Sequence, residues 1–200
     1  LSEVKFELEF LKKMQRKDGS TFHKISGAQW PGFDKSPDTD TQQRYIYSTC
    51  TASTAMAGAA MAMAGRIYSD YDKDFADDCL KRAKAVWKYL SKEKESIYRV
   101  DEGQESGSGP YNDTDDATER CWLAAELFRT TGDKKYENYL MKQQKNTILQ
   151  KPSFFTWDNT LALAQFSYGM AANANHDFQL QVRQKLVDYA DDIANTIKND

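Results

Sequence analysis

Three segments of the chain are apolar on nearly every side when they are drawn as helices. They span residues 49–67, 117–128 and 161–172. A helix that lacks a polar face is normally buried on all sides. Each segment is followed by a short turn and then by a segment whose apolar residues recur at helical spacing. This alternation of inner helix, turn and outer helix predicts an all-α fold built from helical hairpins.

The amphipathic segments supply the outer half of this pattern. In residues 72–92 the apolar side chains recur three or four positions apart, as on one face of a helix. Residues 1–15 and 178–197 follow the same rule, so the chain is predicted to form about seven helices. The aromatic residues that open the outer helices are unequally spaced. This spacing argues against a solenoid with a fixed repeat of about 34 residues.

Composition limits the class of protein. The chain has 200 residues and a mass of 22.9 kDa, which suits one domain over residues 1–200. Its net charge is −3 and no basic face recurs, so nucleic acid is not an expected partner. No apolar run reaches the roughly 20 residues that cross a bilayer, so no membrane span is expected. The chain lacks a signal peptide and does not start with Met, which predicts a mature product or an excised piece.

A long segment between the first two predicted helices is rich in rings. Residues 18–47 carry His23, Trp30, Phe33 and Arg44 and show no obvious secondary structure. Ordered loops of this length in compact domains tend to be functional. The loop is therefore predicted to form a binding wall.

Four blocks of sequence carry a family resemblance. They are DGSTFHKISG at residues 18–27, the run from RYIYSTCTAST to AVWKYL at residues 44–90, YNDTDDATERCWLAAELFRTTGDKKY at residues 111–136, and FTWDNTLALA at residues 155–164. In that order they resemble the central part of the catalytic domain of glycoside hydrolase family 9. The resemblance implies a partial (α/α)6 barrel from a cellulase- or endoglucanase-type enzyme that acts on β-1,4-glucan and works outside the cytoplasm.

The resemblance also implies what the chain does not contain. Family members invert the anomeric centre with two carboxyl groups, an Asp of a DAGD motif as base and a Glu near the C-terminus as acid. Neither motif occurs in the sequence. The first is expected before Leu1, and the second after Asp200. The chain is thus expected to supply cleft wall without catalytic residues and to be inactive alone.

The substrate-binding candidates are His23, Arg44, Tyr111 and Trp157. By resemblance, His23 lines the glucan cleft and hydrogen-bonds a sugar hydroxyl. Tyr111 and Trp157 precede apolar helices, where aromatic rings are suited to the flat apolar faces of sugars. The alternative for Trp157 is packing in the barrel core. Arg44 comes from the same loop as His23.

Carboxylates beside Tyr111 have two interpretations. Asp113, Asp115 and Asp116 stand at the start of an apolar helix, where they either form part of a site or cap free N–H groups. The resemblance further implies a calcium site, with hard oxygen ligands from four carboxylates. These are Asp115, Asp116, Glu119 and Asp158. Arg120 departs from the pattern because it brings a positive charge to that place.

Two alternatives from other classes stay open. One is a helical interaction scaffold with no affinity for sugar, and the other is a carbohydrate-binding module without catalysis. An arc of half a barrel would also leave raw apolar edges, which are expected around residues such as Met61 and Phe166. The chain is therefore predicted to self-associate unless the missing barrel half covers these edges.

Overall fold

The computed structural model describes residues 1–98, 107–109, 111 and 113–199. Its elements are α1 (Ser2–Met14), β1 (Ile25–Ser26), a 3-10 turn η1 (Pro37–Thr39), β2 (Tyr45–Ile46), α2 (Thr51–Ile67), η2 (Tyr68–Asp70), α3 (Lys73–Leu90), α4 (Ala117–Thr131), α5 (Lys134–Lys142), α6 (Lys145–Ile148), α7 (Leu161–Gly169) and α8 (His176–Asn199). The predicted all-α class is confirmed. The described residues form eight α-helices, one beyond the predicted number, because α6 is too short to show a helical period.

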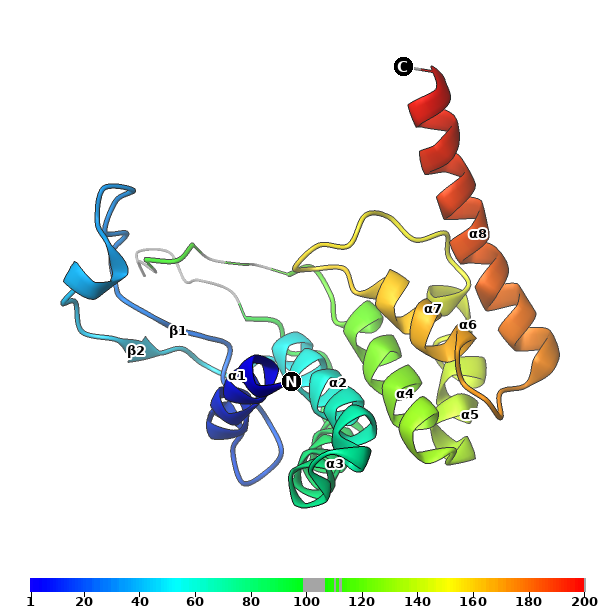
Figure 1. Cartoon of the computed structure of the whole chain (residues 1–200), viewed down its shortest axis with the longest axis horizontal. Helices are drawn as coiled ribbons and strands as arrows, with labels where there is room; N and C mark the ends of the chain where they lie inside the picture. Colours follow the sequence, from blue (N-terminus) through cyan, green and yellow to red (C-terminus); the bar gives the residue numbers. More distant parts are fainter. Residues whose placement is uncertain (99–106, 110, 112, 200) are drawn as a thin grey trace.

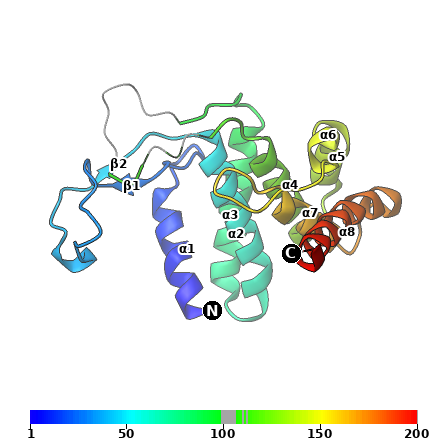
Figure 2. The same ribbon diagram turned by 90° about the horizontal axis from the view of Figure 1, so that it is seen from above.

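The helices form an arc of hairpins. α2 packs against both α3 and α4, α4 packs against α5 and α7, and α7 packs against α8. Each inner helix therefore contacts its neighbouring inner helix as well as its own outer partner. α1 lies at one end of this arc and α8 at the other (Figure 1; Figure 2 gives the view from above). In the described part of the chain, no helix is both long and apolar enough to cross a membrane.

Small residues let α2 and α3 approach closely. A Cβ atom added at Gly58 would lie 2.6 Å from Cγ1 of Val86, far inside van der Waals contact. The predicted stripe of α3 faces this contact, because Cys79, Ala83 and Val86 are fully buried. The sequence prediction for this outer helix is confirmed. A larger residue at position 58 would therefore force these two helices apart.

Buried carboxylates tie the hairpins together. Glu126 of α4 is fully buried; its Oε2 accepts a hydrogen bond from Nη2 of Arg66 at 2.8 Å, and its Oε1 accepts one from the Ser167 hydroxyl. Glu137 of α5 accepts a hydrogen bond at 2.9 Å from the Tyr168 hydroxyl of α7. These bonds cross between α2, α4, α5 and α7. They satisfy carboxylates that would otherwise be costly to bury.

The segment between α1 and α2 contains more regular structure than predicted. β1 and β2 pair antiparallel, with Ile25 opposite Ile46 and Ser26 opposite Tyr45. The resulting hairpin projects from the helices (Figure 1). Near its tip, Trp30 and Phe33 form an edge-to-face pair at 5.4 Å, and Phe33 is 98% exposed. The ladder is only two residues long, so it leaves no clear alternation in the sequence.

Candidate functional site

Three of the four predicted substrate-binding residues line one pocket. His23, Tyr111 and Trp157 do so together with Asp113 and Tyr98. The remaining lining residues are Cys50, Ala52, Ser53 and Met56. The contributing segments precede α2, α4 and α7 or form the first turns of α2. The pocket, which we call the cleft pocket, therefore lies at the shared N-terminal end of the inner helices. Its volume is only about 20 Å³, so it marks where these side chains converge and does not enclose a sugar ring.

Tyr111 and Trp157 form an exposed aromatic pair. Their ring centroids are 5.5 Å apart with an interplanar angle of 82°. Trp157 is 48% exposed and Tyr111 is 45% exposed, so the alternative of Trp157 packing in the barrel core is wrong. Tyr111 has φ of +48°, a left-handed backbone conformation that a large side chain rarely adopts. Strain of this kind is concentrated at functional sites.

His23 is held in place by three contacts. Its ring stacks on Tyr98 at 4.4 Å with an interplanar angle of 22°. Its Nδ1 lies 3.6 Å from Sγ of Cys50, the residue that precedes α2. Its backbone N–H donates a hydrogen bond to the Ser48 carbonyl at 2.9 Å. The imidazole is thus pre-positioned before any ligand enters.

Lys24 brings a cation to the same ring cluster. Its Nζ lies 5.1 Å, 5.9 Å and 5.4 Å from the ring centroids of Tyr47, Tyr98 and Tyr111. The ammonium also donates a hydrogen bond to the Gly109 carbonyl, and burial lowers the pKa of Lys24. Sequence reasoning did not single out Lys24 or Tyr98. Lys24 could have been identified because it directly follows His23, whereas nothing in the sequence distinguished Tyr98 from the other tyrosines.

Arg44 lies apart from this group. Its Nη2 donates a hydrogen bond to Oδ2 of Asp40 at 2.8 Å, and the guanidinium is partly exposed on the hairpin. It is not among the residues that line the cleft pocket. Arg44 is therefore paired within its own segment in this structure, and its contact with substrate stays a prediction.

Two of the three clustered carboxylates act within the turn that opens α4. Oδ1 of Asp113 accepts hydrogen bonds from the backbone N–H groups of Thr114 at 2.7 Å and Asp115 at 3.4 Å. Oδ1 of Asp115 accepts one from the Ala117 N–H at 2.9 Å. Asp115 therefore satisfies the first N–H group of α4, whereas Asp113 bonds N–H groups of the turn before the helix, and the N-cap residue Asp116 makes no side-chain cap bond. Asp113 also lines the cleft pocket, and burial raises the pKa of its carboxyl group.

The four predicted calcium ligands do not form a set. Asp116 is paired with Arg120 at 2.8 Å. Oε1 of Glu119 accepts hydrogen bonds from Thr118 and Thr160, while Oδ1 of Asp158 accepts one from Thr156 at 2.6 Å. Within the described ranges, no three or more His, Cys, Asp or Glu side chains are placed to hold a metal ion. Oδ2 of Asp116 and Oε2 of Glu119 are nevertheless buried without a hydrogen-bond partner in the described structure. Calcium stays a prediction from resemblance.

The burial of Glu119 predicts that the free energy of unfolding depends on pH. It is fully buried, and burial raises the pKa of its carboxyl group from 4.5 to about 7. The folded state therefore binds more protons than the unfolded state between these two values. Stability from this group is fully present at low pH and falls as the pH rises through that window, by about 3 kcal/mol.

The variant Glu119→Gln should remove this pH dependence. Urea unfolding at about pH 5 and about pH 8, with a chelator present, should show a smaller loss of stability in the variant than in the wild type. Glu95→Gln, an exposed carboxylate on a segment after α3, is the control and should leave the slope unchanged. If the free energy of unfolding changed equally with pH in the wild type and in Glu119→Gln, Glu119 would be ionised in the folded state.

Comparisons with known proteins agree with this geometry. The family described as Glycosyl hydrolase family 9 matches residues 1–199. Endoglucanase D of Acetivibrio thermocellus is 30% identical over 203 residues, a match that covers 100% of this chain and 32% of that protein. A cellulose 1,4-beta-cellobiosidase of the same species is 33% identical over 198 residues, covering 86% of this chain and 22% of that protein. The chain thus spans a third or less of these relatives.

Solved structures give the same answer. The endoglucanase J30 of glycoside hydrolase family 9 superposes with a TM-score of 0.88 at 40% sequence identity, covering 94% of this chain and 35% of that one. A metagenome-derived family 9 endoglucanase superposes with a TM-score of 0.84 at 35% identity. The hairpin arc, the ring-lined pocket at the inner-helix ends and the match over residues 1–199 lead to one assignment. The chain belongs to glycosyl hydrolase family 9.

Proposed function

We propose that the chain forms part of the cleft wall of an inverting β-1,4-glucan hydrolase that acts outside the cytoplasm. The observation that carries the proposal is the exposed pair of Tyr111 and Trp157, at 5.5 Å, beside the fixed imidazole of His23. The names of the relatives, endoglucanase and cellobiosidase, support the choice of substrate class. The catalytic carboxyl groups belong to other parts of the enzyme in this proposal.

The chemistry of the cleft pocket suits a glucan. The axial C–H bonds of a β-glucoside make its ring faces apolar, so the exposed rings of Tyr111 and Trp157 supply contact area. Polar groups at the edge of the rings complete the site. The ammonium of Lys24 can donate to sugar hydroxyl oxygens, and the Asp113 carboxyl group can accept from sugar hydroxyl groups. The ring nitrogens of His23 point inward, with Nδ1 toward Sγ of Cys50 and Nε2 buried, so its imidazole supports the Tyr98 ring in this state.

Binding of cellohexaose to the isolated chain tests this proposal. Calorimetric titration should detect binding, and Trp157→Ala should weaken it about tenfold, since loss of one aromatic contact costs about 1.5 kcal/mol. Trp30→Ala is the matched control, because Trp30 is exposed but stands on the hairpin outside the cleft pocket. Affinity lost in Trp30→Ala and retained in Trp157→Ala would place the site elsewhere. Absence of any sugar binding would favour the helical scaffold.

The proposal extends to the association state of the chain. Phe6 is 72% exposed on α1 and Phe166 is 54% exposed on α7. A separate apolar hollow of about 500 Å³ lies between α1, α2 and Trp122 of α4, and Phe10, Met14 and Phe22 contribute to its lining. Met61, which was predicted to lie on this edge, is fully buried instead. A second copy of the chain covers these faces in the proposed assembly.

Light scattering measures this association. At micromolar concentration the mass should exceed the 22.9 kDa of one chain, because contiguous exposed apolar surface favours association. Phe10→Ser should lower the mass, whereas Phe33→Ser on the hairpin should not. A wild-type mass near that of one chain, together with cooperative thermal unfolding, would contradict the proposal.

A further inference from the structure

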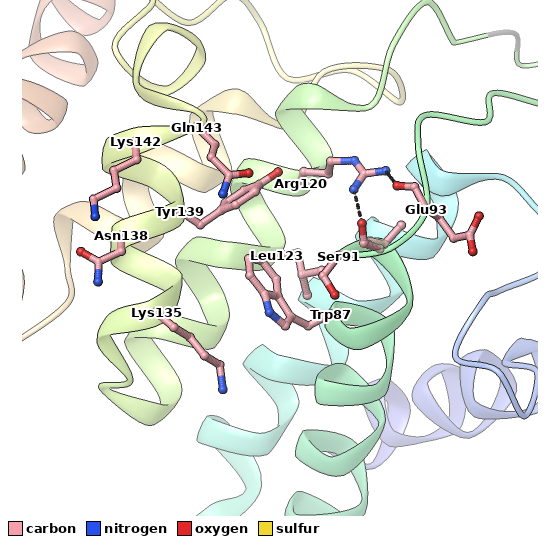
Figure 3. A pocket seen from close by; sticks show the side chains of 11 residues that line it. Trp87, Ser91, Glu93, Arg120, Leu123, Lys135, Asn138, Tyr139, Lys142 and Gln143 are labelled. Atoms are coloured by element: carbon pink, nitrogen blue, oxygen red, sulfur yellow. Dashed lines mark hydrogen bonds between the residues drawn. The ribbon is translucent and has the colours of Figure 1, made fainter.

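A second pocket lies on the outer side of the arc, between α3, α4 and α5. Its volume is about 510 Å³, and it shares no lining residue with the cleft pocket. Figure 3 shows Trp87, Ser91 and Glu93 on one side and Asn138, Tyr139 and Gln143 on the other. We call it the outer pocket. Its volume falls in the range that accommodates small organic ligands.

Aromatic rings form one wall of the outer pocket. Trp87 of α3 meets Tyr139 of α5 edge to face, with centroids 5.0 Å apart. Tyr136 also meets Trp87 edge to face, at 4.9 Å, and is buried. Trp87 and Tyr139 are partly exposed and line the pocket, and their ring contacts with each other and with Tyr136 restrain them. Rings held in this way need no ordering when a ligand binds.

The charges around the outer pocket cancel. Arg120 is neutralised by Asp116 at 2.8 Å, and Lys135 by Asp133 at 2.8 Å. Of the charged side chains that line the pocket, this leaves the Lys142 ammonium on α5 and the Glu93 carboxylate just beyond α3. One positive and one negative group give no net charge. The pocket therefore lacks the excess of positive charge that selects a carboxylate or phosphate ligand.

The polar groups around the rings are suited to hydroxyl groups. The amides of Asn138 and Gln143 each offer a donor and an acceptor, and both side chains are exposed at the pocket. Arg120 braces the rim, because its Nη1 and Nη2 donate hydrogen bonds to the carbonyls of Leu90 at 2.8 Å and Glu93 at 3.2 Å (Figure 3). These bonds hold the chain at the end of α3 against α4.

Fixed ring surface, paired amides and balanced charge together are the chemistry that recognises a neutral sugar. We propose that the outer pocket binds a short neutral oligosaccharide, with Trp87 and Tyr139 contacting the sugar faces and Asn138 and Gln143 contacting the hydroxyl groups. This site is independent of the cleft pocket. It would hold a glucan chain, or a side branch of one, against the outer face of the arc.

Nuclear magnetic resonance of the labelled chain tests the proposal with cellotetraose as the probe. The indole N–H of Trp87 and the amide groups of Asn138 and Gln143 should shift in a saturable way. The double variant Asn138→Ala/Gln143→Ala should raise the dissociation constant obtained from the Trp87 signal about tenfold, because two hydrogen bonds are lost. Asn146→Ala/Gln150→Ala, which alters the same residue types outside the pocket, should leave that response unchanged.

Two further arms separate this site from the cleft pocket and from anion binding. Trp157→Ala should leave the response of the Trp87 signal unchanged even when signals from the cleft pocket no longer shift. The two binding sites can therefore be tested separately. Sodium glucuronate should not shift the Trp87 signal. The proposal is overturned if cellotetraose does not shift the signals of the outer-pocket residues, or if glucuronate shifts them and cellotetraose does not. It is also overturned if Asn138→Ala/Gln143→Ala does not change the response of the Trp87 signal.

Discussion

The isolated chain is expected to release no product from carboxymethylcellulose or cellobiosides. Inverting hydrolysis needs a general acid and a water-activating base, about 6.5–9.5 Å apart, on opposite sides of the scissile bond. Among the described residues that line the cleft pocket, Asp113 is the single carboxylate, and its Oδ1 already accepts two backbone N–H groups. A reducing-sugar assay, with a complete family 9 endoglucanase assayed in parallel, measures this.

Activity in the isolated chain would reveal a second catalytic arrangement. The informative outcome is turnover that disappears in Asp115→Ala or Asp116→Ala, because those carboxylates follow shortly after the pocket residue Asp113. Asp77→Ala, on the exposed face of α3, serves as the control. Turnover that depends on either Asp115 or Asp116 would mean that capping and ion pairing do not exhaust their roles.

Replacing Glu126 with alanine is expected to lower the free energy of unfolding by about 3–5 kcal/mol. The change removes both hydrogen bonds of a fully buried carboxylate and leaves the Arg66 guanidinium without its anion. Nε of Arg66 already lacks a hydrogen-bond partner in the described structure, so the remaining charge would be poorly solvated. Urea denaturation monitored by helical circular dichroism gives the measurement.

Asp77→Ala is the matched control for burial. Asp77 pairs with Lys73 at 2.7 Å, a distance close to that of the Arg66–Glu126 pair, but the Lys73 and Asp77 side chains are 77% and 64% exposed. An exposed pair contributes about 0.5 kcal/mol because water screens both charges. Similar losses in Glu126→Ala and Asp77→Ala would show that the buried network adds nothing beyond a surface ion pair.

The sequence was sufficient to define the longer helices. The stripe in residues 72–92 predicted α3 to within two residues, and the apolar segment at residues 49–67 predicted α2 equally well. Helical hydrogen bonds are local, and burial of one face leaves a periodic record in the residues themselves. The hairpin of β1 and β2 left no such record, because its short ladder pairs residues about twenty positions apart.

The candidate site could be predicted only in part, because its residues come from segments far apart in the chain. The sequence singled out His23, Tyr111 and Trp157 by residue type and by resemblance, yet their meeting in one pocket depends on how α2, α4 and α7 pack. Arg44 was grouped with them but pairs locally with Asp40.

The buried carboxylates show the limit most clearly. Glu119, Glu126 and Glu137 resemble solvated helix residues in the sequence, but all three are buried. Each also accepts a hydrogen bond from a partner more than thirty residues away along the chain. The sequence by itself determined which segments are helical and which faces are apolar, because both follow from local spacing. Only the tertiary structure decided which polar groups meet, because those contacts join segments whose spacing in the chain carries no information about their distance in space.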